Sequence, residues 1–159
     1  MSGKVIIIMG SKSDFELSKT IGSYLEKLGV EYEFRVASAH KTPEKVLEIL
    51  RENENKKVVY ITVAGRSNAL SGMVDANTSK PVIACPPYSD KFSGADIFSS
   101  LRVPSGIGSV VTLEPEGAAI AAAKILALED KQLEERIRAY QLSKREELEG
   151  ADEEIRRMK

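Results

Sequence analysis

The chain has 159 residues, of which 42% are hydrophobic and 30% charged, and its formal net charge is -1 at pH 7. This length suits one domain with a substantial core, and the near-neutral charge argues against a protein that binds nucleic acid through a basic face. A single cysteine and a single histidine exclude an intramolecular disulfide, a cysteine-cluster metal site and a zinc site built from several imidazoles. His40 is therefore the only imidazole of its own that the chain can use as an acid or base.

No apolar run is long enough to span a bilayer, so the sequence predicts no membrane partner. The first residues lead from Met1 into an apolar run without the basic, hydrophobic and small-residue regions of a signal peptide. We therefore expect a cytoplasmic protein. Cys85 is expected to be a small buried hydrophobic residue there, because no second histidine or cysteine could activate it as a nucleophile.

The first elements are a buried strand, a helix and a half-exposed strand. Residues 4–9 (KVIIIM) form a continuous apolar run, the pattern of a strand buried on both faces. A helix ending at Gly29 follows, and Ser13 and Glu16 have the spacing of a capping box at its start. Residues 30–36 alternate apolar and polar, which predicts a strand that is half exposed or at an edge of the sheet.

The same alternation continues to about residue 128. Thr42 is expected as the N-cap of the next helix and Pro43 as its first residue. Residues 58–63 (VVYITV) predict a third, buried strand. The remaining elements in chain order are a short helix at 69–76, a strand at 81–85, a helix at about 96–101, a strand at 110–113 and an alanine-rich helix at about 116–128.

Residues 131–159 have the pattern of one long charged helix with a narrow apolar stripe at Leu133, Ile137 and Tyr140. The stripe is too thin for a core helix. A solvated helix that packs on its own domain and a helix that packs across a subunit interface both fit this pattern.

Five strand–helix alternations with short connections predict a parallel sheet with helices on both faces. The sequence has no low-complexity segment and no fixed-period repeat. We expect a single domain over residues 1–159, with an α/β core at 1–128 and a C-terminal helical extension at 129–159.

Chemically distinctive residues follow four of the predicted strands. Ligands bind outside the carboxyl ends of the strands in an open parallel sheet. Any one of these clusters could be only a turn, but their common position favours a functional site. The clusters lie at residues 10–14, 38–42, 65–68 and 86–89.

The first two clusters carry features of a polar ligand site. Residues 10–14 place small and hydroxyl side chains at a helix start, where free backbone N–H groups bind anions, although neither a P-loop nor a dinucleotide fingerprint is present. Asp14 is better suited to accept hydrogen bonds from sugar hydroxyls than to face a phosphate; Ser13 or Asp14 could also simply cap the helix. His40 can take and return a proton, and Lys41 can neutralise a phosphate or carboxylate.

Five stretches of the chain carry a family resemblance, at residues 9–14, 38–43, 64–72, 85–87 and 99–106. On these residues the chain resembles the phosphoribosylaminoimidazole carboxylases of purine biosynthesis, through about Leu128. The resemblance implies a three-layer α/β/α, flavodoxin-like fold with about five parallel strands. It also implies a homo-oligomer, an octamer or a tetramer, and no metal, ATP or organic cofactor.

The family has two branches. One is a mutase that moves a carboxyl group from nitrogen to carbon; it carries a second histidine in its third loop and usually an arginine after the histidine of its second loop. This chain instead has Arg66, Ser67 and Asn68 in the third loop, and Lys41 after His40. These features resemble the branch that carboxylates 5-aminoimidazole ribonucleotide (AIR) directly with CO2 to give 4-carboxy-5-aminoimidazole ribonucleotide (CAIR).

The resemblance also implies roles for individual residues. Carbon 4 of AIR would attack CO2, and His40 would then remove the proton from that carbon. Nucleotide binding is assigned to Gly10, Ser11, Ser13, Asp14, Ser38 and Lys41, and CO2 or carboxylate binding to Ser67, Asn68 and Ala69.

Two alternatives stay open from the sequence. The mutase reaction on N5-carboxyaminoimidazole ribonucleotide would give the same CAIR. A flavodoxin-like binding or signalling module would not be an enzyme; a signalling receiver needs a phosphoacceptor aspartate at the end of the third strand, where this chain has residues 65–67 (GRS).

Overall fold

The computed structural model describes residues 3–158. Met1 and Ser2, and Lys159 as the predicted end of the C-terminal helix, lie outside the described residues. A parallel sheet forms the centre of the molecule, in the order β2-β1-β3-β4-β5. This is the flavodoxin-like strand order. The strands are β1 (Lys4–Met9), β2 (Glu31–Val36), β3 (Val58–Val63), β4 (Val82–Ala84) and β5 (Val110–Val111).

Burial explains the different strand patterns. Every residue of β3 is buried, and so are five of the six residues of β1. Both strands have neighbours on each side, which explains their continuous apolar sequences. β2 lies at the edge and is only half-buried, as its alternating sequence predicts. Met9 pairs with both Val36 and Val63, so three strands end level at one edge of the sheet.

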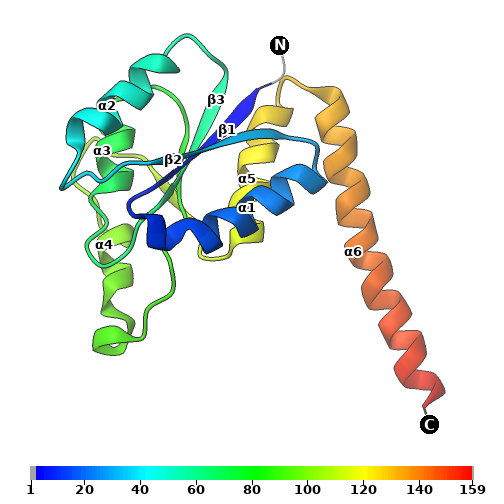
Figure 1. Cartoon of the computed structure of the whole chain (residues 1–159). Coiled ribbons are helices and arrows are strands. Elements are labelled where there is room, and N and C mark those ends of the chain that lie inside the picture. The colour runs from blue at the N-terminus through cyan, green and yellow to red at the C-terminus, as the bar shows by residue number, and fades with distance from the viewer. Residues whose placement is uncertain (1–2, 159) are drawn as a thin grey trace.

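Helices cover both faces of the sheet (Figure 1). β1 shows how the two cores divide, because Val5 and Ile7 pack with one set of helices while Ile6 and Ile8 pack with the other. The three-layer α/β/α prediction is therefore confirmed. On the first face lie α1 (Phe15–Lys27), α5 (Pro115–Ala127) and the start of α6 (Lys131–Arg157), and on the second lie α2 (Pro43–Glu52) and α3 (Leu70–Ala76).

The fourth and fifth strands are shorter than predicted, and the segment between them differs most from the expectation. A 3-10 stretch, η2 (Lys91–Ile97), precedes the short α4 (Phe98–Leu101), so the helix expected from residue 96 begins two residues later. η2 is broken by left-handed backbone at Phe92, Ser93 and Gly94. Only the glycine signals such a backbone in the sequence.

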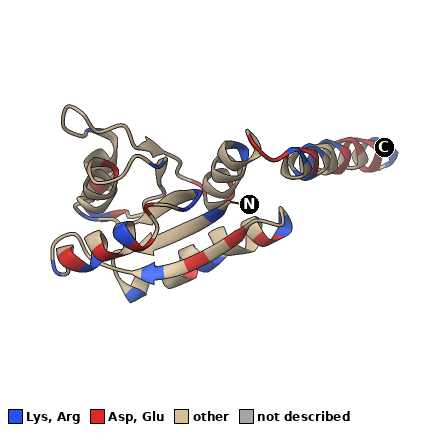
Figure 2. Ribbon diagram, turned by 90° about the horizontal axis from the view of Figure 1, so that it is seen from above, with Lys and Arg blue, Asp and Glu red and all other residues tan. Residues whose placement is uncertain are grey.

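α6 has a docked half and a projecting half (Figure 1). Leu133 and Ile137 are buried against the core, and the Tyr140 hydroxyl donates to Glu116 Oε1 of α5 at 2.5 Å. The predicted stripe therefore packs on its own domain. Beyond it, α6 leaves the body with basic and acidic residues intermixed along its length (Figure 2). Its exposed apolar side chains there are Leu142, Leu148, Ile155 and Met158.

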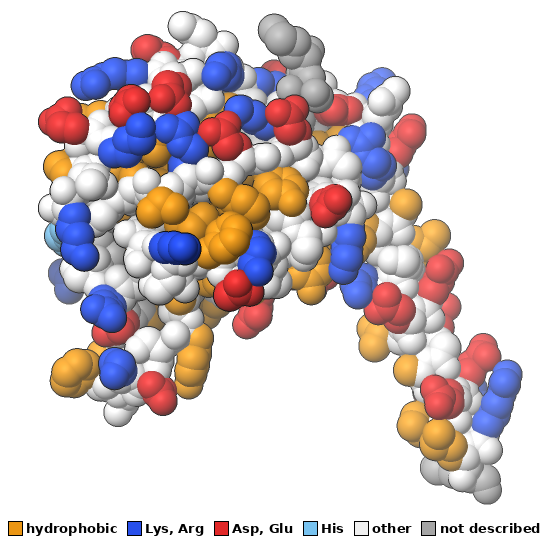
Figure 3. Space-filling view, viewed as in Figure 1, with side chains coloured by type: hydrophobic (Ala, Val, Ile, Leu, Met, Phe, Trp, Pro, Cys, Tyr) orange, Lys and Arg blue, Asp and Glu red, His pale blue; other side chains and the backbone are white. Residues whose placement is uncertain are grey.

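An aromatic cluster lies on the outside of α1 and β2. The ring of Phe34 meets those of Phe15 and Tyr32 edge to face, with centroids 5.4 Å and 5.2 Å away. Figure 3 shows hydrophobic side chains gathered over this part of the surface. Gly22 of α1 permits this packing, because a Cβ there would lie 2.7 Å from Tyr32 Cε2.

Candidate functional site

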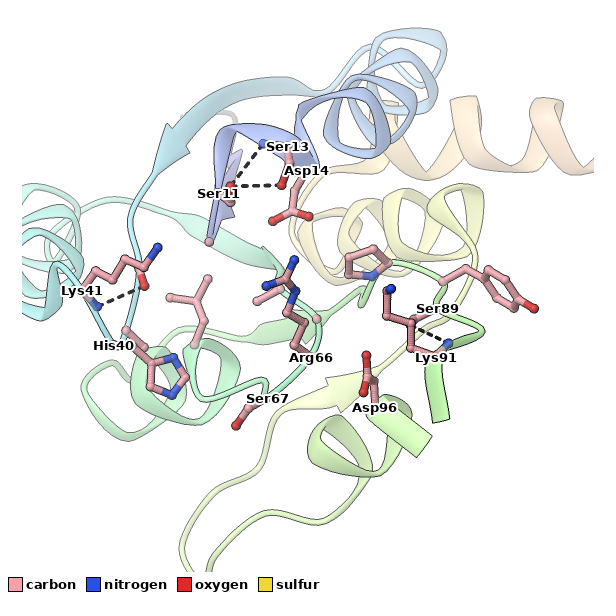
Figure 4. Close-up of a pocket in the computed structure, with 18 residues that line it drawn as sticks. Ser11, Ser13, Asp14, His40, Lys41, Arg66, Ser67, Ser89, Lys91 and Asp96 are labelled. Carbon is pink, nitrogen blue, oxygen red and sulfur yellow. Dashed lines mark hydrogen bonds between the residues drawn. The ribbon is translucent and has the colours of Figure 1, made fainter. Parts of the chain in front are cut away.

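A pocket of about 700 Å³ opens at the carboxyl edge of the sheet, where four loops converge (Figure 4). The loops follow β1, β2, β3 and β4, as the strand-end clusters predict. Gly65 lets two of them approach closely, because a Cβ there would lie 3.3 Å from the Pro87 ring. The predicted site residues that line the pocket are Gly10, Ser11, Ser13, Asp14, Ser38, His40, Lys41 and Ser67.

The loop after β1 is organised by Ser11 rather than by a capping box. The Ser11 hydroxyl accepts from the backbone N–H of Ser13 at 3.3 Å and from the Ser13 hydroxyl at 3.0 Å, and so caps the 3-10 turn η1 (Lys12–Asp14). Asp14 takes the N-cap position of α1 but makes no side-chain capping bond. The capping box predicted for Ser13 and Glu16 is therefore wrong, because η1 delays the start of α1.

Asp14 is a partly buried acid within this loop (Figure 4). Burial raises the pKa of its carboxyl group, and a hydrogen bond from the Ser11 backbone and the positive charge of Arg66 oppose that rise. The alternative that the Asp14 side chain only caps α1 is not supported, because the carboxylate makes no capping hydrogen bond and lines the pocket. It is thus available to a ligand.

The loop after β2 is closed by side chain–backbone hydrogen bonds. The Thr42 hydroxyl accepts from the Ser38 N–H at 2.9 Å, and the Ser38 hydroxyl accepts from the Lys41 N–H at 3.1 Å. Thr42 takes the N-cap position of α2 and Pro43 begins the helix, both as predicted, although the Thr42 side chain makes no capping bond. These bonds hold a tight loop from which His40 lines the pocket in an exposed position (Figure 4).

The three residues predicted to bind CO2 lie in the loop after β3, and only one of them lines the pocket. Ser67 lines the pocket, whereas Asn68 and Ala69 do not. Asn68 is 6% exposed, and its side chain donates to the Ser100 hydroxyl at 2.9 Å and accepts from the Ser71 N–H at 3.2 Å. The Asn68 side-chain amide therefore forms its hydrogen bonds with other groups of the protein interior. CO2 binding by this loop stays a prediction.

Four charged or aromatic residues line the pocket without having been assigned a ligand role from the sequence: Arg66, Tyr88, Lys91 and Asp96. Arg66 stood in a recognised cluster, and the strand-end rule could have included it. Lys91 and Asp96 lie in η2, a segment for which the sequence predicted no site residue and in which Asp96 was expected to start a helix. Together with Lys41 and Asp14 they make a lining of both charge signs, suited to a ligand that carries anionic and hydroxyl groups.

Three other structural findings bear on function. Within residues 3–158, no three His, Cys, Asp or Glu side chains are grouped to hold a metal ion. No helix in this part of the chain has the length and apolar character needed to cross a membrane. Cys85 is fully buried as predicted, and burial raises the pKa of its thiol to about 11.

A family model described as AIR carboxylase matches residues 4–147 of the chain. The chain belongs to the AIR carboxylase family. This confirms the family resemblance and favours an enzyme over a non-catalytic flavodoxin-like module.

Similar individual proteins support the assignment to the AIR carboxylase family. A phosphoribosylaminoimidazole carboxylase of Archaeoglobus fulgidus is 62% identical over 153 residues, covering 96% of this chain and 85% of the relative. A phosphoribosylaminoimidazole carboxylase of Treponema denticola is 48% identical over 155 residues, covering 96% and 98%. The crystal structure of Treponema denticola PurE superposes with a TM-score of 0.93 at 47% identity, covering 96% of this chain and 98% of that one.

Proposed function

We propose that this chain carboxylates AIR with CO2 to form CAIR, a reversible step of purine biosynthesis. The observation that carries the proposal is the meeting of the family's loops in one pocket, where the chain's only histidine stands among the predicted nucleotide-binding residues. We propose that residues 1–159 act as one catalytic domain, in the cytoplasm and without a metal, ATP or organic cofactor.

Nucleotide binding is assigned to the first two loops. The hydroxyls of Ser11 and Ser13 and the backbone around Gly10 offer donors to the ribose phosphate, and the Asp14 carboxylate accepts from ribose hydroxyls. Ser38 and Lys41 complete this part of the pocket. Supporting this assignment, all six residues line one continuous cavity.

The chemistry needs a proton acceptor but no covalent intermediate. The amino group of AIR makes carbon 4 an enamine-type nucleophile, which forms a carbon–carbon bond to CO2 while an electron pair moves onto a CO2 oxygen. Donors in the loop of Ser67 stabilise this developing carboxylate. His40 then takes the proton from carbon 4, and the electrons of that C–H bond restore the aromatic ring. In reverse, His40 returns the proton and CO2 leaves.

Two features of the chain favour CO2 over the N5-carboxylated nucleotide as the carboxyl source. The third loop has Ser67 and Asn68 where the mutase branch carries a second histidine, and His40 is the only histidine of the chain. Direct carboxylation requires one proton acceptor at carbon 4, which a single imidazole can provide.

The test supplies purified protein with AIR and 13C-labelled bicarbonate. We expect CAIR labelled in its carboxyl group, formed at a rate proportional to protein concentration. The opposite reaction, release of CO2 from CAIR, should be catalysed as well. Absence of both reactions in folded protein would contradict the proposal.

We also propose that the chain works as a homo-oligomer, an octamer or a tetramer. The projecting half of α6 supports an assembly, because its exposed apolar residues, such as Leu148 at 74% exposure, have no cover within the described chain. A second copy of the chain would bury them.

A further inference from the structure

Arg66 adopts a backbone conformation that is costly for its residue type. Its φ is +59°, in the left-handed region that glycine enters freely and that residues with a Cβ enter at an energetic cost. Such a conformation persists only where the surrounding structure holds it, and it is often found where function needs it.

Hydrogen bonds to the start of α4 hold this loop. The Ser99 hydroxyl accepts from the Asn68 N–H at 2.9 Å and lies 3.3 Å from the Arg66 carbonyl oxygen and 2.8 Å from that of Asp96. The buried Asn68 side chain adds its bond to Ser100. The peptide groups on both sides of Ser67 are therefore tied to a segment about thirty residues away.

The side chain that this backbone carries points into the pocket (Figure 4). Arg66 extends toward Asp14, close enough that its charge opposes the rise in the carboxyl pKa. No ion pair within 4.0 Å joins Arg66 to an acid among residues 3–158, so its guanidinium is not neutralised by a direct partner. A planar fork of N–H donors in this position fits a phosphate or a carboxylate through two parallel hydrogen bonds.

We propose that Arg66 binds an anionic oxygen group of the nucleotide and that its left-handed backbone is maintained to aim it there. The inference rests on the proposed function, because the nucleotide is AIR or CAIR. Two groups share the required chemistry: the 5'-phosphate present in both nucleotides, and the carboxylate present in CAIR alone. Because AIR lacks the carboxylate, measuring the binding of both nucleotides shows which of the two groups Arg66 contacts.

The experiment compares Arg66→Gly with Ser93→Gly. Ser93 also has a left-handed backbone, at φ +57°, but does not line the pocket, so its replacement relieves the same backbone cost without removing a pocket side chain. The readouts are the Kd for AIR by calorimetry without CO2, the KM for CAIR in decarboxylation, and Tm. We expect both variants to be at least as stable as the wild type, because glycine favours this backbone.

For Arg66→Gly, loss of a charge-assisted pair should weaken nucleotide binding at least about tenfold, and Arg66→Lys should restore part of the loss. Weakening toward both AIR and CAIR assigns the phosphate, and weakening toward CAIR alone assigns the carboxylate. Changes below about twofold toward both nucleotides overturn the proposal, and so does an equal loss in Ser93→Gly. If the wild-type protein binds AIR but neither forms nor decarboxylates CAIR, the proposed function is refuted, and the Kd for AIR still tests the role of Arg66. If the wild-type protein binds no AIR, the proposed function and the proposed role of Arg66 are both refuted.

Discussion

At the scale of single residues, the proposed chemistry depends on His40. It is the chain's only imidazole and lies exposed at the pocket, where a substrate atom can reach it. Asparagine is similar in size and polar but cannot take up a proton near neutral pH. We predict that His40→Asn keeps the fold and the Kd for AIR, while kcat for carboxylation falls at least about a hundredfold. Circular dichroism and calorimetry provide the controls, and near-normal turnover would refute the role.

Asp14, the proposed ribose-binding acid, is expected to reduce stability at neutral pH. Because burial raises the pKa of its carboxyl in the folded protein, folding favours the protonated form. The stabilisation by the protonated group is present below its ordinary pKa of 3.8 and is lost as pH rises through the folded value, so the ionised group is unfavourable at pH 7.

Asp14→Asn should therefore be at least as stable as wild type at pH 7, with the difference in Tm shrinking as pH falls toward 4. Its affinity for AIR should fall, because the amide accepts fewer hydrogen bonds from ribose hydroxyls. Glu26→Gln on the exposed side of α1 is the control, expected to change neither property. Unchanged AIR affinity in Asp14→Asn would contradict the ribose assignment.

At the scale of elements, the long buried strands and the amphipathic helices could be predicted, and so could the presence of the short strands β4 and β5, but not the exact bounds of these two strands. The apolar runs of β1 and β3 and the buried face of α2, with Val46, Ile49 and Leu50, follow from residue pattern alone. β4 and β5 have three and two residues, too few to show a period. Partners far apart in the sequence, such as Asn68 and Ser100, are not visible in any local pattern.

Asn68 gives the sharpest test of how the pocket loop is anchored. Removing its amide leaves the Ser71 N–H and the Ser100 hydroxyl without their buried partner. We predict that Asn68→Ala lowers the free energy of unfolding by about 1–3 kcal/mol. In Asn77→Ala, which loses a single exposed bond to the Met73 carbonyl, the change should stay below about 0.5 kcal/mol. Urea denaturation measures both free energies. Equal losses in the two variants would mean that the buried Asn68 network contributes no more than a single exposed hydrogen bond.

At the scale of the whole molecule, the body and the projecting part of α6 are expected to have separate tasks. The core helices and the docked start of α6 enclose the sheet, whereas residues beyond Ser143 extend away from it (Figure 1). A chain truncated after Ser143 should keep a cooperative unfolding transition, because Leu133, Ile137 and Tyr140 remain. It should form smaller particles than the full chain.

Light scattering after size-exclusion chromatography measures this difference. The full chain should exceed its 17.4 kDa monomer mass severalfold, as an octamer or tetramer does. If the truncated chain forms an assembly with the same number of subunits as the full chain, the projecting part of α6 is not the contact between subunits.

CO2 itself is the carboxyl donor in the proposed reaction. The most direct measurement presents the same enzyme preparation either with AIR and CO2 or with N5-carboxyaminoimidazole ribonucleotide, and follows CAIR formation against enzyme-free controls. We predict that CAIR forms from AIR at a rate that rises with CO2 concentration, and that the N5-carboxylated nucleotide yields CAIR no faster than it releases AIR and CO2. Rapid conversion of that nucleotide under CO2-free conditions, with little turnover of AIR and CO2, would instead make the chain a mutase.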